Sequence, residues 1–213
     1  MEMQYIFLAV FAVVSAVYMT TLAFKPSLLQ FVLKGLLMPL VLCIYISGAG
    51  GIFWPIVLAL IFAWIGDVLL LKITNILWFK LGLASFLVGH LFYIIAMSGY
   101  ILPPNVPVLV ISTVVASAFM VVVYKVTKPG KPMRVPVIAY EFIIMLMFLS
   151  ALQLVLVQNN VFGILVFIGS ICFVASDTML ALRTFRKVKI YFAVMATYIA
   201  AQLFITLGFC ALG

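Results

Sequence analysis

The sequence predicts an all-α, polytopic integral membrane protein with eight transmembrane helices. Hydrophobic residues make up 69% of the 213-residue chain and charged residues 8%, whereas a soluble domain is apolar over roughly half of its residues. The mean hydropathy of +1.44 agrees with this composition. The apolar residues are gathered in runs of about 20, the length that an α-helix needs to cross a bilayer.

Eight such runs follow one another along the chain. They are expected near residues 4–22, 29–46, 53–71, 76–97, 106–124, 135–157, 161–182 and 190–212. Short segments rich in Gly, Pro, Ser or Asn separate them, among them 25–27, 47–51 and 128–132, and segments of this composition form turns. They leave no room for a soluble domain, so residues 1–213 are predicted to form a single transmembrane helical domain.

The basic residues predict the orientation of the bundle. All 12 Lys and Arg residues lie in or near the first, third, fifth and seventh connections. Because cytoplasmic loops collect Lys and Arg, these odd-numbered connections are expected in the cytoplasm and both termini on the opposite side. Short loops with this bias suit a bacterial inner membrane, and the net charge of +8 is attributed to topology and to contact with membrane lipids rather than to nucleic acid.

Two of the four acidic residues lie deep inside apolar runs. Asp67 follows Gly66 near the end of the third run, and Asp177 follows Ser176 in the seventh. A charge at membrane depth costs about 2.5 to 3.5 kcal/mol on insertion scales, so such residues usually face the protein interior and have a function. With a rise of about 1.5 Å per residue, Asp67 is expected about 7 Å and Asp177 about 9 Å from the basic rim.

Other polar residues are expected near the same level. By the same rise, Glu141 lies about 10 Å from the rim with Tyr140 beside it, and His90 about 15 Å. Lys34 should reach the same region, so the sequence predicts a polar chamber open toward the cytoplasmic leaflet.

Each of these residues also has a structural interpretation. His90 falls on a helical stripe with Phe86 and Tyr93 and can equally be a neutral core histidine; a single His is poor evidence for a metal site. Glu141 can neutralise Lys34 or Arg134. Intramembrane tyrosines are often packing residues; those in question are Tyr93, Tyr140 and Tyr198.

The two Asp residues are 110 positions apart and fall on the third and seventh predicted helices. Four helices per half keep the halves parallel, so this spacing is compatible with two parallel four-helix repeats about an axis along the membrane normal. Two carboxyl groups that lie close together in a low dielectric do not easily both ionise and tend to share one proton. Such a pair can protonate a substrate and activate water, as in the cleavage of acetals and glycosides. A lipid is the expected substrate, because the chamber lies within one leaflet.

A set of short motifs in a fixed order accompanies these residues. The set comprises Lys34 early in the second run, Gly66-Asp67 followed by leucines, Gly89-His90-Leu91-Phe92-Tyr93, Pro136 with Tyr140, and Ser176-Asp177 leading to Leu182-Arg183-Thr184-Phe185. With these motifs the chain resembles the YhhN-like family of eight-helix membrane proteins, which includes the transmembrane lysoplasmalogenases. Lys34-Gly35 departs from the Lys-Pro that is common in the family.

The resemblance implies hydrolysis of the vinyl ether bond of lysoplasmalogens, the lyso-alkenyl glycerophospholipids of ethanolamine or choline, to a fatty aldehyde and a glycerophospho-base. Asp67 and Asp177 would be catalytic, one as the acid and the other stabilising the cation and directing water, in an order that the sequence leaves open. Residues that would orient the pair or bind the lysophospholipid are His90, Lys34, Tyr140, Glu141, Tyr93 and Ser176. The reaction requires no metal or organic cofactor.

Proteins of other classes also use intramembrane carboxylates. A small-molecule or lipid transporter would have them at the midplane of repeated halves, and would give substrate flux without product. An intramembrane aspartyl protease is disfavoured, because Trp64 occupies the first Gly position of its Gly-x-Gly-Asp motif. A lipid sensor would keep the chamber but tolerate the loss of either carboxylate.

Overall fold

The chain is helical in every element of the part that the computed structural model describes, residues 2–24, 27–72 and 75–212, with the side chain of Lys72 left out. The α-helices are α1 (Glu2–Thr21), α2 (Leu28–Gly48), α3 (Trp54–Leu69), α4 (Ile76–Ser98), α5 (Val106–Thr127), α6 (Arg134–Gln158), α7 (Val161–Arg186) and α8 (Tyr191–Cys210). Short 3₁₀ turns occupy Leu70–Lys72 and Lys131–Met133. The all-α prediction is confirmed, while Lys25 and Pro26 of the first predicted turn lie outside the described residues.

Seven helical segments in the described chain are long and apolar enough to cross a membrane; α3 is shorter, at 16 residues. Its length corresponds to about 24 Å, which falls short of the roughly 30 Å hydrocarbon core. The 3₁₀ turn at Leu70–Lys72 continues it by about 6 Å. The third predicted span therefore ends as a tighter helix rather than as a continuous α-helix.

Two helices continue further than the sequence predicts. α5 ends at Thr127 and α7 at Arg186, three and four residues past the expected positions. Both have basic residues in the last turn, and in both the next residue, Lys128 or Lys187, adopts the left-handed conformation that ends a helix. Positive charges stabilise a helix C-terminus by interacting with its dipole, which explains the extra turn.

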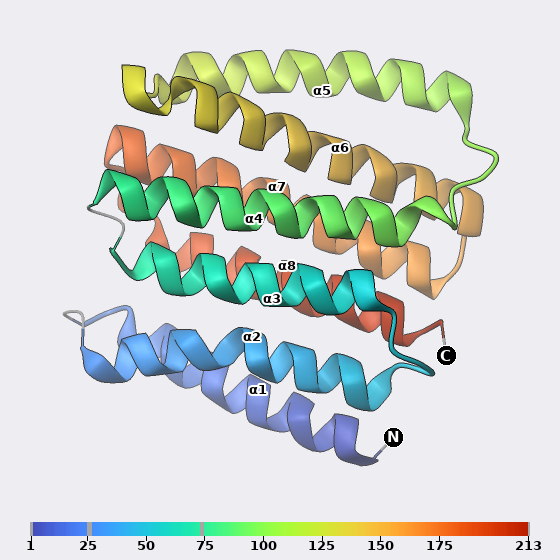
Figure 1. Ribbon diagram of the computed structural model, residues 1–213, viewed down its shortest axis with the longest axis horizontal. Helices are drawn as coiled ribbons and strands as arrows, with labels where there is room; N and C mark the ends of the chain where they lie inside the picture. Colours follow the sequence, from blue (N-terminus) through green and yellow to red (C-terminus); the bar gives the residue numbers. More distant parts are fainter. Residues whose placement is uncertain (1, 25–26, 73–74, 213) are drawn as a thin grey trace.

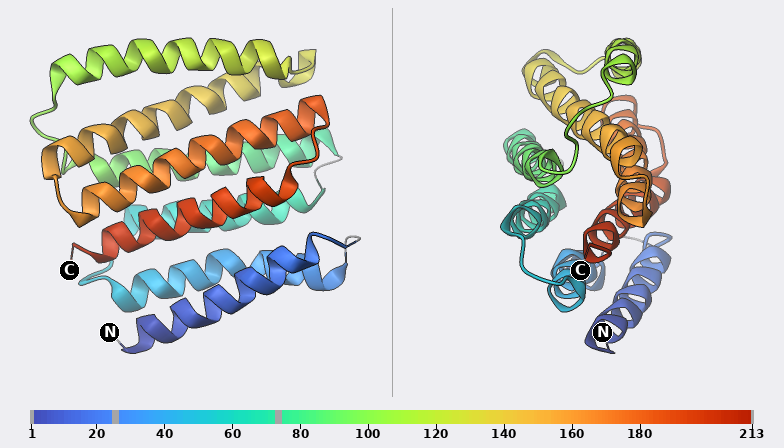
Figure 2. Two further views of the ribbon diagram at one scale, coloured as in Figure 1. Left: turned by 180° about the vertical axis from the view of Figure 1, so that it is seen from behind. Right: turned by 90° about the vertical axis from the view of Figure 1, so that its right-hand side faces the viewer.

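The eight helices run alternately up and down in two rows (Figure 1). Seen along the helices, α2, α3 and α4 form one row and α6, α7 and α8 the other, with α1 and α5 at opposite ends (Figure 2, right). The connections α1–α2, α3–α4, α5–α6 and α7–α8 lie at one end of the bundle, here named the basic end. Both termini lie at the other, here named the terminal end (Figure 1).

The packed pairs of helices correspond in the two halves. α3 packs on α4 as α7 packs on α8, and the halves meet where α4 packs on α6 and α2 on α8. Two parallel four-helix repeats would give this pairing. The outermost helices differ, because α1 contacts α8 whereas α5 contacts α7. α5 thereby covers the face of α7 that carries Asp177.

Glycines let the helices approach closely. A β-carbon at Gly169 of α7 would lie 2.9 Å from the carbonyl oxygen of Ala201 and 2.6 Å from the side chain of Ile205, both on α8. One at Gly89 of α4 would lie 3.2 Å from the carbonyl oxygen of Ala59 on α3. Backbone atoms at these distances leave no space for a methyl group.

We expect Gly169→Ala to lower the free energy of unfolding by about 1 to 3 kcal/mol, since overpacking forces the α7 backbone away from α8. Gly35→Ala is the matched control, because nothing lies within 4 Å of a β-carbon at Gly35. The unfolding midpoint of both variants in detergent provides the measurement. Equal midpoints would mean that α7 and α8 are not held at this distance.

Candidate active site

Asp67 is held on α3 by two neighbouring helices. Its Oδ1 lies 3.4 Å from Nζ of Lys34 on α2, and its Oδ2 accepts a hydrogen bond of 2.7 Å from the hydroxyl of Tyr198 on α8. The side chains of the ion pair are 4% and 8% exposed. The cation and the hydroxyl donor thus offset part of the cost of burying the carboxylate.

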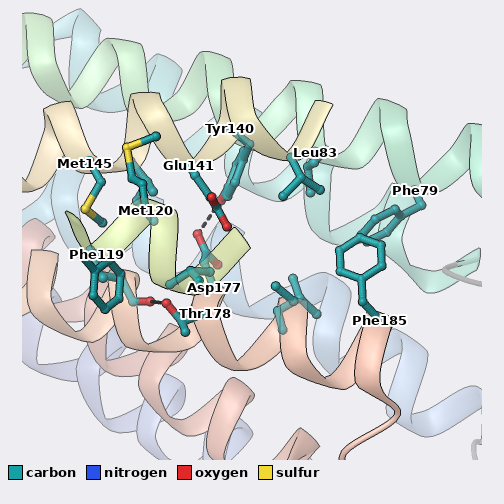
Figure 3. Close-up of a pocket in the computed structure, with 16 residues that line it drawn as sticks. Phe79, Leu83, Phe119, Met120, Tyr140, Glu141, Met145, Asp177, Thr178 and Phe185 are labelled. Carbon is teal, nitrogen blue, oxygen red and sulfur yellow. Dashed lines mark hydrogen bonds between the residues drawn. The ribbon is translucent and has the colours of Figure 1, made fainter. Parts of the chain in front are cut away.

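Asp177 on α7 has different partners. Its Oδ2 accepts a hydrogen bond from the hydroxyl of Tyr140 on α6 (Figure 3), and it forms no ion pair with any described side chain. Both carboxyl groups therefore accept a hydrogen bond from a Tyr hydroxyl, but only Asp67 also has a cation beside it among the described side chains. Asp177 lacks this stabilisation of a buried negative charge.

One cavity brings the two carboxyl groups together. This polar chamber has a volume of about 220 Å³. Its polar lining residues include Lys34, Asp67, Ser176, Asp177, Arg183 and Tyr198. Because α3 and α7 come from opposite halves of the chain, the chamber exists only where the two rows of helices meet.

The chamber adjoins a basic surface cavity at the basic end. Arg183 and Tyr191 line both the chamber and this cavity, which also includes Lys187 and Lys189 and has a volume of about 680 Å³. The guanidinium carbon of Arg183 lies 4.0 Å from the ring centroid of Tyr191, a cation–π distance. An anionic group entering from this end meets fixed positive charge before it reaches the carboxyl groups.

On the other side of Asp177 lies an apolar pocket between α4, α5, α6 and α7 (Figure 3). Its volume is about 40 Å³, little more than one water molecule occupies. Glu141 and Asp177 are the acidic residues on its wall. The remaining lining includes Phe79, Leu83, Phe119, Met120 and Met145. Asp177 thus separates a polar space from an apolar one.

The structure divides the predicted residues into three groups. Lys34, Asp67, Ser176 and Asp177 line the polar chamber, and Tyr140 and Glu141 line the apolar pocket. His90 and Tyr93 line neither cavity. Instead of the single polar chamber that the sequence predicts, the structure has two cavities, and Asp177 lines both.

The interpretation of Glu141 as a partner of Lys34 or Arg134 is wrong. Lys34 pairs with Asp67 instead, and Oε1 of Glu141 is buried without a hydrogen bond among the described residues. The reason is geometric, because Glu141 lines the apolar pocket beside α5 and α7 (Figure 3), whereas Lys34 lines the polar chamber.

His90 contacts the site only through a neighbour. Its Nδ1 donates to the carbonyl oxygen of Phe86 at 2.6 Å, and Nε2 is buried without a partner in the described chain. Its ring packs edge-on against Tyr140, with centroids 5.6 Å apart, and against Phe173 at 4.7 Å. His90 can influence Asp177 by positioning Tyr140, and the prediction that it touches the chamber is not met.

Tyr93 and Ser176 join helices. The Tyr93 hydroxyl donates to Oε1 of Gln202 at 2.6 Å; Gln202 follows Tyr198 by one turn on α8. Ser176 lines the chamber, but its hydroxyl donates to the carbonyl oxygen of Val194 at 3.0 Å and ties α7 to α8. Ser176 therefore contributes to the wall of the chamber, whereas Tyr93 lines neither cavity.

The sequence analysis missed Tyr198 as a site residue and interpreted it as packing. Tyr198 donates to Asp67 and its ring packs against Phe86 and Phe173. A usable signal was present, because Gln202 follows Tyr198 by one turn, and two polar residues on one face of an apolar helix indicate a polar neighbour. Arg183 was interpreted as a topology signal and as part of a family motif, and Tyr191 was not singled out.

Together these features define an all-helical protein with long apolar helices compatible with a membrane protein, and with two carboxyl groups on one internal chamber. The model of the YhhN family matches residues 29–209, which include both carboxyl groups and all their hydrogen-bond partners. The chain belongs to the YhhN family. Neither the curated proteins nor the solved structures contain a match to this chain.

Proposed function

We propose that this protein is a lysoplasmalogenase, a hydrolase that cleaves the vinyl ether bond of lyso-alkenyl glycerophospholipids to a fatty aldehyde and a glycerophospho-base. The observation that carries the proposal is that Asp67 and Asp177 line one chamber with different partners, a cation for Asp67 and only a hydroxyl for Asp177. Vinyl ether hydrolysis needs an acid and an anion at the same time.

The partners of the two carboxyl groups support different roles for them. Asp177, without a cation, is the proton donor. Asp67, paired with Lys34, is the carboxylate that stabilises the positive charge of the transition state and then accepts a proton from water. Tyr140 fixes the orientation of the Asp177 carboxyl group, and Tyr198 that of Asp67.

The reaction then proceeds in balanced steps. Asp177 gives its proton to the β-carbon of the vinyl ether, so that the double bond becomes a C–H bond and an oxocarbenium ion forms at the carbon bonded to the ether oxygen. Water adds to this carbon and gives one proton to the Asp67 carboxylate. The hemiacetal then collapses: Asp67 gives its proton to the glycerol oxygen as the C–O bond breaks, and the hemiacetal hydroxyl gives its proton to Asp177 as the aldehyde forms. One water molecule is consumed.

The charges of the bundle support a lysophospholipid as the substrate. Its phosphate would lie in the basic cavity near Arg183, Lys187 and Lys189, which adjoins the chamber. Arg183 and Asp177 are six residues apart on α7, about 9 Å along the helix, so the phosphate and the ether bond can occupy both places at once. The basic end would face the cytoplasm, in a bacterial inner membrane, as Lys and Arg distribution favours.

The direct test compares two ether lipids with purified protein in detergent. We expect aldehyde from a lyso-alkenyl phosphoethanolamine and none from the corresponding lyso-alkyl lipid. The saturated ether has no double bond, so its β-carbon cannot accept a proton. Absence of aldehyde from well-folded protein would contradict the proposal. Flux of the lipid across sealed vesicles without aldehyde would indicate a transporter instead.

A further inference from the structure

A lateral groove continues the apolar pocket away from the basic end. It lies between α5, α6 and α7 and has a volume of about 470 Å³. Phe119, Met145 and Val174 line both the groove and the pocket, so the two spaces are contiguous. The groove is apolar apart from Ser112, whose hydroxyl donates to the carbonyl oxygen of Val108 within α5.

The four cavities form a series in which each shares lining residues with the next: Arg183 and Tyr191, then Asp177 and Leu180, then Phe119, Met145 and Val174. Starting at the basic end, they are the basic cavity, the polar chamber, the apolar pocket and the lateral groove. α6 runs from the basic end to the terminal end, and Leu152 in the groove follows Glu141 in the pocket by 11 residues, about 16 Å. Charge therefore lies at one end of this series and apolar surface at the other, with the carboxyl groups between them.

We propose that the apolar pocket and the lateral groove bind the hydrocarbon chain of a single-chain phospholipid. The inference rests on the proposed function only for the ether bond of the lipid. That the occupant is a phospholipid with one chain is argued from the order of the cavities. A molecule with an anionic head and one apolar tail matches the order in which the positively charged, polar and apolar cavities adjoin one another. Its tail would pass Asp177 into the pocket beside the chamber, and the distal part would follow α6 through the groove toward the terminal end.

The small volume of the pocket is the reason why we expect it to admit one chain and not two. At about 40 Å³ it is the smallest of the four cavities, and it lies between the chamber and the groove. Met120 and Met145 form part of its wall, and unbranched Met side chains change conformation readily. One chain is admitted when they move, whereas a second chain would need a further displacement of the same wall.

The test labels the chain position without requiring turnover. The probe is a lyso-alkyl phosphoethanolamine with a diazirine in the distal half of its chain, photolysed with the protein in detergent. We expect adducts on Met145, Phe148 and Val174, identified by mass spectrometry. Adducts distributed over the outward surfaces of α1, α5 and α8 would overturn the proposal.

A matched pair of variants on α5 sharpens the result. Val115 lines the groove and is 62% exposed, whereas Val114 is 66% exposed and lines none of the four cavities. Val115→Trp should reduce groove labelling about tenfold, which corresponds to about two methylene groups displaced from apolar contact. Val114→Trp should leave labelling unchanged; an equal effect of both variants would contradict a chain in the groove.

The two proposals fail in different ways. Groove labelling without aldehyde release would keep the chain site and reject the hydrolase. Aldehyde release with labelling that Val115→Trp does not change would keep the hydrolase and reject the chain site.

Discussion

Asp177→Asn is expected to lower kcat for aldehyde release by about 10³-fold, the contribution typical of a positioned general acid. The amide has nearly the shape of the carboxyl group and still accepts the hydrogen bond from Tyr140, so the bundle should fold. It has no acidic proton to transfer to the β-carbon. The rate of aldehyde release and the unfolding midpoint, measured on the same preparation, separate these two effects.

Two controls make this result specific. Glu2→Gln removes the carboxylate that lies outside both cavities, at the start of α1, and should leave the rate unchanged. In D₂O the parent protein should place one deuterium on the carbon next to the aldehyde group, because the proton comes from an exchangeable acid. If Asp177→Asn keeps more than about a tenth of the rate, Asp177 is not the proton donor.

The helices were predictable from the sequence because the bilayer allows few alternatives. A spanning segment must satisfy its backbone hydrogen bonds internally, so an apolar run of about 20 residues is nearly always a helix. Asp67 and Asp177 were predictable for a related reason, since an acidic residue in such a run requires a polar neighbour. Composition and spacing carry both signals.

The partners of the carboxyl groups were harder to predict. Lys34 on α2 and Tyr198 on α8 contact Asp67 on α3. The rotation of each helix about its axis determines which of its side chains faces the carboxyl group. α2 and α8 are apolar on all their faces, so the pattern of apolar residues does not show which face is buried in the protein. Glu141 was misinterpreted for this reason, because depth alone does not say which side of α6 it occupies.

The position of α5 could not be predicted from sequence either. α5 packs mainly against α6 and α7, whereas its counterpart α1 packs against α2 and α8. This difference gives the two Asp residues unlike surroundings, because the space beside Asp177 is walled by α5 and is apolar. Two halves of similar design thus produce one acid in an apolar wall and one carboxylate beside a cation.

The ion pair of Lys34 and Asp67 gives the second large expected effect, on stability as well as activity. Lys34→Met leaves the Asp67 carboxylate buried without a cation, and removal of one partner of a buried pair costs about 3 to 5 kcal/mol. The double variant Lys34→Met with Asp67→Asn should regain most of the lost free energy of unfolding, because no unpaired charge remains. Its aldehyde release should stay near background, because the anion that stabilises the oxocarbenium ion is gone.

The single variant Asp67→Asn completes the thermodynamic cycle. It should be less destabilising than Lys34→Met, because Lys34 lies near the start of α2 and its long side chain can turn toward the basic end, whereas the short Asp67 side chain cannot. Denaturant titration of all four proteins gives the coupling free energy between the two residues. A double variant that is both stable and as active as the parent would mean that the pair only joins α2 to α3, and that the negative charge in the chamber is not needed for the reaction.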